Sequence, residues 1–154
     1  MDTTTARNPA AAPLLVRRAD LAGERHVAAL LREAPVDPLE VADLIRHHRV
    51  LVLSDLTQPS AAPPLAAAAF RLHRPARTAQ LAGIGVRPHL RRRGLGRRLL
   101  TGALTWLRAD GFEQVHVFAA PGEAGASLLA SAGFTAVGQD TDRADGRSRL
   151  VLLL

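Results

Sequence analysis

The residues best suited to bind a charged group lie between Val86 and Leu100, in the sequence VRPHLRRRGLGRRLL. This segment joins an expected strand to the start of an expected helix, where backbone N–H groups lack acceptors and the helix dipole is positive. Gly94 and Gly96 remove side chains there, so an anion can approach the backbone. The compact anion that fits best is a pyrophosphate. The nearby side chains that can pair with phosphate are all arginines: Arg91, Arg92, Arg93, Arg97 and Arg98.

The distribution of charge supports an anionic partner for this segment. All 20 basic residues of the 154-residue chain are arginine, and the formal net charge is +6. Residues 87–98 hold six of these arginines and no acid, whereas the remaining 14 arginines are matched by 14 acidic residues. The whole excess therefore lies in one short segment, which indicates an anionic ligand more strongly than a diffuse charge would.

Two common phosphate-binding loops do not match. A Walker loop requires lysine, and the chain has none. The dinucleotide fingerprint GxGxxG fails because Leu99 stands where its last glycine should be. The chain also has no cysteine, which excludes disulfides, thiolate metal sites and a cysteine nucleophile.

The elements expected to position this segment form one domain of residues 14–154, preceded by a tail of residues 1–13. Periodicity and breakers predict helices over about 20–33, 38–48, 92–109 and 122–132. They predict strands over 14–18, 50–53, 65–73, 78–86, 114–118, 135–138 and 148–154. This mixture indicates an α/β (or α+β) domain around one sheet. Gly83 and Gly85 lie inside a predicted strand, which indicates a bulge or a close approach by backbone or ligand. Leu150–Leu154 is apolar throughout and is expected to form a central strand covered on both faces.

The residues Val86, Pro88, Arg91, Gly94 and Gly96 resemble the coenzyme A turn of the GNAT superfamily of N-acetyltransferases, V-x-P-x-x-[R/Q]-x-x-G-x-[G/A]. The order of elements over residues 14–154 is similar to that family, as is the segment SLLASAGF at 127–134. One position differs, since residue 92 is arginine where the family often has a small residue. The resemblance implies a GNAT-like fold, with one mixed, mostly antiparallel sheet of six to seven strands flanked by about four helices.

The resemblance implies direct transfer of an acetyl group from acetyl-CoA to a primary amine in a ternary complex, without a metal. The pantetheine arm is expected to pair with a splayed strand, and the pyrophosphate with the turn that follows it. The residues expected to bind acetyl-CoA are Ile84, Gly85, Val86, Arg91, Arg92, Arg93, Gly94, Leu95, Gly96 and Arg97, with Arg98 also near the phosphates.

The catalytic groups depart from the family pattern. Many members carry a carboxylate on the strand before the turn, but residues 78–86 have none, and Gln80 can only hold a water. Many also place a tyrosine at the position of Leu129, whereas this chain has no tyrosine. His116 is the proposed base, because an imidazole titrates near neutral pH. His73 and His89 are interpreted as phosphate neighbours or surface residues rather than bases. Ser127 or Ser131 could orient the thiolate, and water alone could carry the proton.

The acceptor is expected to be a small-molecule or peptide amine bound near residues 34–39 and 140–147. The acids that could attract a cationic amine are Asp37, Glu40, Asp140, Asp142 and Asp145. The resemblance implies a homodimer. A cytoplasmic location is expected because the sequence shows neither a signal peptide nor a membrane span. Two alternatives remain. One is a CoA-binding domain without catalysis. The other is a nucleic-acid-binding module, disfavoured because aromatic residues for base stacking are scarce.

Overall fold

The computed structural model describes residues 13–31, 38–119, 125–139 and 148–154. These residues form a seven-stranded sheet with the order β1-β2-β3-β4-β5-β7-β6. The strands are β1 (Leu14–Arg18), β2 (Arg49–Asp55), β3 (Ala66–His73), β4 (Thr78–Val86), β5 (Gln114–Ala119), β6 (Thr135–Gln139) and β7 (Ser148–Leu153). Neighbouring strands are antiparallel except β4 and β5, which run parallel. The expected mixed, mostly antiparallel sheet is confirmed.

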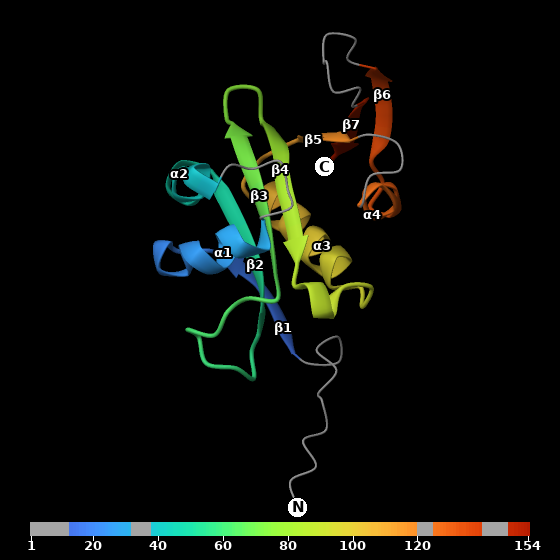
Figure 1. Cartoon of the computed structure of the whole chain (residues 1–154). Coiled ribbons are helices and arrows are strands. Elements are labelled where there is room, and N and C mark those ends of the chain that lie inside the picture. Colours follow the sequence, from blue (N-terminus) through green and yellow to red (C-terminus); the bar gives the residue numbers. More distant parts are fainter. Residues whose placement is uncertain (1–12, 32–37, 120–124, 140–147) are drawn as a thin grey trace, which may run out of the picture.

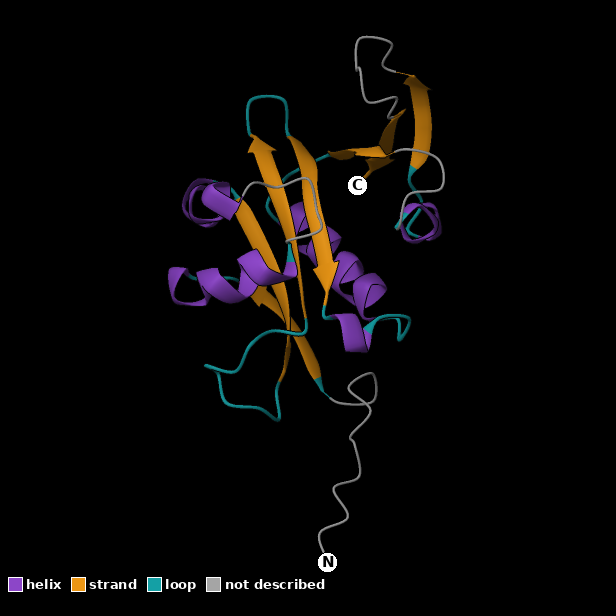
Figure 2. Ribbon diagram, in the orientation of Figure 1, coloured by secondary structure: helices purple, strands orange, loops and turns teal. Residues whose placement is uncertain are grey.

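Helices cover both faces of the sheet (Figures 1 and 2). On one face lie α1 (Glu24–Leu30) and α2 (Val41–His47), which follow the short 3-10 helices η2 (Leu21–Gly23) and η3 (Pro38–Glu40). On the other face lie α3 (Leu95–Ala109) and α4 (Ala126–Ser131). The α3 residues that recur every fourth position, Leu95, Leu99, Ala103 and Leu107, are all buried against the sheet. The chain therefore has two cores separated by the sheet.

The centre of the sheet is made of small residues. Ala66–Ala69 of β3 are all fully buried, alternately against the α3 core and against the α1/α2 core. Because alanine side chains project so little, both helix layers come close to the sheet. This brings α1 near enough to β4 that the two backbones touch, as described below for Gly85.

Some boundaries predicted from the sequence were wrong. The helix expected from Arg92 starts at Leu95, because Arg92 and Gly94 have φ angles of 64° and 74°, which no right-handed helix tolerates. The expected helix from Asp20 begins as η2, capped by a hydrogen bond from the Gly23 N–H to Asp20 Oδ1 (3.0 Å), and only then becomes α1. The start expected at Gly122 lies outside the described residues, and α4 begins at Ala126.

The last strand is central but is covered on only one face at its end. β7 lies between β5 and β6, as expected, but Leu153 is 75% exposed. The prediction that Leu150–Leu154 is covered on both faces was therefore wrong. The α1/α2 layer does not cover this end of the sheet (Figure 1). No helix among the described residues is long and apolar enough to cross a membrane.

Candidate acetyl-CoA and amine site

The strands β4 and β5 separate after a short paired region. Only Thr78–Gln80 pair with Gln114–His116, so residues 81–86 of β4 have no partner on β5. In Figure 1 the two strands lie together at the start of β4 and diverge toward η4 (Pro88–Leu90). A β-bulge contributes to this geometry: Ala69 faces Gly83 and Phe70 faces Leu81, which leaves Ala82 as an extra residue. The flank of Ile84, Gly85 and Val86 that faces β5 is therefore free to pair with an extended amide ligand.

The segment after β4, residues 91–97, is named here the anion-binding turn. The backbone N–H groups of residues 92–97 have no acceptor among the described residues, and the first helical bond of α3 runs from the Arg98 N–H to the Gly94 carbonyl (3.1 Å). Successive free N–H groups with alternating left-handed residues form a concave anion site. A Cβ added at Gly94 would meet nothing within 4 Å, so this turn is open to a ligand. The turn therefore has the open backbone and free donors that an anion site requires, and its binding of a pyrophosphate stays a prediction.

The arginines of the turn are exposed and lie around these N–H groups. Arg91 donates from Nε to the Val86 carbonyl at 3.3 Å, which holds the turn against the end of β4. Among the described residues, Arg92, Arg93 and Arg97 form no salt bridge. Their charges are therefore available to an anion, although exposed guanidinium groups contribute less than buried ones.

Two glycines of the predicted site have packing roles. A Cβ at Gly85 would lie 1.8 Å from the Leu30 carbonyl oxygen, so the close approach expected there comes from α1. A Cβ at Gly96 would lie 3.3 Å from Leu128 Cδ2 and 3.5 Å from Val86 Cγ2, so this glycine brings α3 close to α4 and β4. The absence of a side chain at each of these two glycines is therefore explained by packing within the protein, without a ligand.

Gln80 and His116 are opposite each other on the last paired rung of β4 and β5. Both lie on the α1/α2 face, because their neighbours Ala79 and Val115 belong to the α3 core. The structure thus brings together, at the point where the strands diverge, the two residues that sequence reasoning offered as base and water holder. Their catalytic roles stay predictions.

The environment of His116 favours the neutral imidazole. Burial lowers the pKa of His116, and the positive charge of Arg149 lowers it further. Its Nδ1 atom is buried and has no hydrogen-bond partner among the described residues. The ring also contacts Phe118 edge-on, with centroids 6.0 Å apart. A neutral imidazole at this position can accept a proton at neutral pH.

A row of polar residues extends from His116 across the sheet. Gln80 is opposite Arg71 of β3, whose Nη2 donates to Glu40 Oε2 at 2.6 Å. Glu40, offered as an acid for the amine, is thus already paired, and Arg71 is a site neighbour that sequence reasoning missed. The alternation of β3 could have placed Arg71 on this face, but only the register shows that it lies beside Gln80.

The remaining candidates are separated from this row or lie outside the described residues. Leu129, at the tyrosine position of the family, is buried in the α3 core. Ser131 donates from Oγ to the Leu128 carbonyl at 2.7 Å, and Ser127 is exposed on α4. His73 and His89 are exposed at the ends of β3 and η4. No cluster of three or more metal-ligating side chains occurs in the described part of the chain. Asp37, Asp140, Asp142 and Asp145 lie outside it.

Comparisons with known proteins show the family and the fold. The sequence profile of the Acetyltransferase (GNAT) family matches residues 28–134, and the chain belongs to this family. A search of curated protein sequences found no match.

Solved structures of similar fold include several acetyltransferases. The IAA acetyltransferase from Bacillus cereus is 18% identical, with a TM-score of 0.71, over 92% of this chain and 100% of that one. The ribosomal-protein-S18-alanine N-acetyltransferase from Escherichia coli is 20% identical, with a TM-score of 0.70, over 92% and 93%. A chain of the NatC complex, solved with Gag peptide and CoA, is 13% identical, with a TM-score of 0.74, over 92% and 98%. At these identities the likeness concerns the fold.

Proposed function

We propose that this protein is an acetyl-CoA-dependent N-acetyltransferase that moves an acetyl group directly to a primary amine. The observation that carries the proposal lies at the end of the unpaired edge of β4. There the six backbone N–H groups of residues 92–97 have no acceptor in the described part of the chain. Membership of the acetyltransferase family supports the same activity.

Each part of the site has a role in this proposal. The N–H groups and arginines of the anion-binding turn hold the pyrophosphate, and the free flank of Ile84–Val86 pairs with the pantetheine amides. Acetyl-CoA, once bound, supplies the acetyl group as a thioester. Neutral His116 accepts the proton that the amine loses, and Gln80 orients a water beside it. These residues position the amine on the α1/α2 face, opposite the side on which α3 lies.

The proposed acceptor is a small-molecule or peptide amine. Several solved structures of the same fold are acetyltransferases for such amines, including the spermidine/spermine N-acetyltransferase from Vibrio cholerae. The row of Arg71, Gln80 and His116 gives this chain a polar floor for the acceptor.

Calorimetric titration with acetyl-CoA tests the anion-binding turn. Arg97→Pro removes one N–H within the first turn of α3, where proline is tolerated, and Arg97→Ala removes only the side chain. We expect Arg97→Pro to bind about 10- to 150-fold more weakly than Arg97→Ala, because a hydrogen bond to a charged group is worth about 1.5–3 kcal/mol. Arg108→Ala, at the far end of α3, is the control and should bind as the wild type does. Equal affinities for both Arg97 variants would contradict the role of the backbone.

Turnover is tested separately by a free-thiol assay over a panel of primary amines and peptides. We expect release of CoA with the wild type and a loss of about 10²–10⁴-fold in kcat for His116→Gln, the usual contribution of a general base. Acetyl-CoA binding without turnover on any amine would instead assign a CoA-binding domain without catalysis. Absence of binding, together with salt-dependent binding to DNA or RNA, would assign the arginines to nucleic acid.

A further inference from the structure

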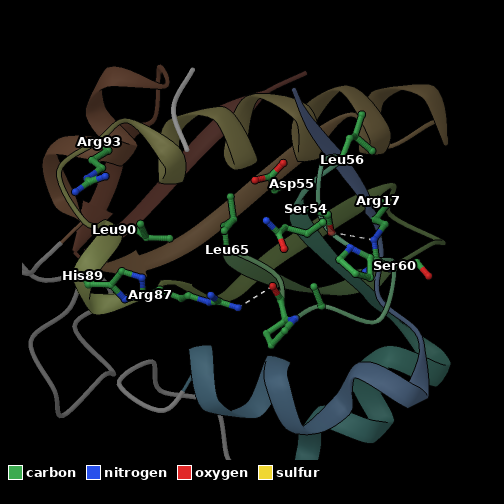
Figure 3. A pocket seen from close by; sticks show the side chains of 14 residues that line it. Arg17, Ser54, Asp55, Leu56, Ser60, Leu65, Arg87, His89, Leu90 and Arg93 are labelled. Atoms are coloured by element: carbon green, nitrogen blue, oxygen red, sulfur yellow. Dashed lines mark hydrogen bonds between the residues drawn. The ribbon is translucent and has the colours of Figure 1, made fainter. Parts of the chain in front are cut away.

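A pocket of about 660 Å³ lies beside η4 on the flank of β4 that faces β3. This η4 pocket is lined by the ends of β1 and β2, the segment between β2 and β3, and η4 itself (Figure 3). The Arg87 N–H bonds the Leu65 carbonyl at 3.1 Å, which closes the floor between β3 and β4. Its volume is in the range of small-molecule sites. The proposed acetyl-CoA site lies on the opposite flank of β4, toward β5.

The charged side chains of the η4 pocket are mostly positive. Arg17, Arg87 and Arg93 line it, together with His89 and one carboxylate, Asp55 (Figure 3). None of the three guanidinium groups forms a salt bridge with a carboxylate of the described residues.

Neutral partners hold two of these guanidinium groups in place. Arg17 donates from Nε to Ser54 Oγ at 2.9 Å, and Arg87 donates from Nη2 to the Pro63 carbonyl at 2.7 Å. A guanidinium has five N–H donors, so both side chains keep donors for a ligand. Asp55 Oδ1 accepts from the backbone N–H (2.8 Å) and hydroxyl (2.6 Å) of Thr57. The pocket therefore combines fixed positive charge with unused donors.

The rest of the lining is apolar and selects the body of the ligand. The apolar residues are Leu56, Pro59, Ala62, Pro63, Leu65 and Leu90. A hydrated inorganic ion would leave this surface uncovered, whereas an aromatic or aliphatic body would bury it. The lining thus favours a molecule with one anionic end and one apolar end.

We propose that the η4 pocket binds a small organic anion, with an apolar body that carries a phosphate or carboxylate. Arg17 and Arg87 bind the anionic group from the two sides of the pocket, and the leucines and prolines contact the body. Of the described residues that line the η4 pocket, only Arg93 is also part of the anion-binding turn. The proposal does not depend on acetyl transfer, because the pocket and the proposed acetyl-CoA site lie on different flanks of β4.

Calorimetric titration of the full chain with phenyl phosphate, in the presence of saturating CoA, tests the proposal. Benzoate tests whether carboxylate replaces phosphate, inorganic phosphate tests the need for the body, and phenol tests the need for the charge. For a ligand of this size we expect a Kd of about 1 mM or tighter for phenyl phosphate or benzoate. Inorganic phosphate and phenol should each bind at least about tenfold more weakly.

Two variants and one matched control locate the binding. Arg17→Gln and Arg87→Gln should each weaken the binding of the better probe by about tenfold or more. Arg18→Gln, the exposed neighbour on the same strand, should leave it unchanged because adjacent side chains of a strand point to opposite faces. Thermal unfolding of each variant shows whether it is folded, and the Arg87 variant tests the pocket independently of the Arg17–Ser54 hydrogen bond.

Three results would overturn the proposal. One is the absence of binding by both aromatic anions to a folded wild type. Another is equal weakening by Arg18→Gln, which would indicate general attraction to a basic surface. The third would be seen when the titration is repeated without CoA: binding that occurs only in the absence of CoA and that Arg17→Gln and Arg87→Gln do not weaken, which would place the probe in the acetyl-CoA site.

Discussion

Replacing Gly85 by alanine separates a packing role from a ligand role for this glycine. The added Cβ would lie 1.8 Å from the Leu30 carbonyl oxygen and 2.7 Å from its carbon. Both atoms are backbone at the end of α1, so no side-chain rotation relieves the overlap, and α1 must move away from β4. The movement would loosen the α1/α2 core, which includes Leu31 and Ala82.

The expected cost can be worked out from this contact. Overpacking a core costs about 1–3 kcal/mol, and a contact with backbone belongs at the upper end of that range. We expect Gly85→Ala to lower the free energy of unfolding by about 3 kcal/mol. For a chain of this length the Tm should fall by about 6–12 °C.

Urea and thermal unfolding of the ligand-free protein measure this cost. The control is Gly23→Ala, because a Cβ there meets only Asp20 Oδ1 at 3.7 Å, and the φ angle of −90° suits alanine. That variant should unfold within about 0.5 kcal/mol of the wild type. If Gly85→Ala were equally stable and only bound acetyl-CoA more weakly, the packing explanation would be wrong and the ligand explanation right.

Three further predictions follow from other contacts. Arg149→Gln removes a charge that lowers the pKa of His116, so that pKa should rise but stay below about 6.5, since burial still lowers it. The imidazole acts in its neutral form, so the acid limb of kcat/KM against pH should shift to higher pH in the Arg149 variant. An unmoved limb would exclude His116 as its origin. Asp110→Ala should lower the free energy of unfolding by about 2–3 kcal/mol, because it leaves the buried guanidinium of Arg49 without its carboxylate. Arg49→Met, which removes the buried charge itself, should lower it by less. A larger loss for Arg49→Met than for Asp110→Ala in urea unfolding would contradict this. Gly102→Ala should lower the free energy of unfolding by about 1–3 kcal/mol in the same assay, because the added Cβ would lie 2.4 Å from Cγ2 of Val16 in β1. An unchanged free energy of unfolding would show that β1 shifts without cost.

Local sequence signals determined much of the fold. The four-residue spacing of leucines in α3, the glycine-rich turn and the run of alanines in β3 each act over a few residues. Their effects on periodicity and backbone conformation therefore do not depend on distant contacts. The helix start was wrong by three residues, because a basic run shows no local sign that Arg92, a non-glycine residue, adopts a left-handed conformation.

The roles of single residues were decided by distant parts of the chain. Gly85 could be interpreted from the sequence as a contact for a ligand, but the carbonyl that fills the space comes from Leu30, 55 residues earlier. Glu40 was offered as an attractor for the amine, but the register of β3 places Arg71 within reach of it. Leu129 matched a catalytic position of the family, yet it lies in the core.

By itself, the sequence determined the family, the anion-binding turn and the residues Gln80 and His116 as candidates, because residue type and spacing carry those signals. Only the tertiary structure decided that Gln80 and His116 share the last rung of β4 and β5, and that Arg149 acts on the pKa of His116. The physical reason is that strand register and the depth of burial arise from pairing between segments far apart in the chain, which no local pattern encodes.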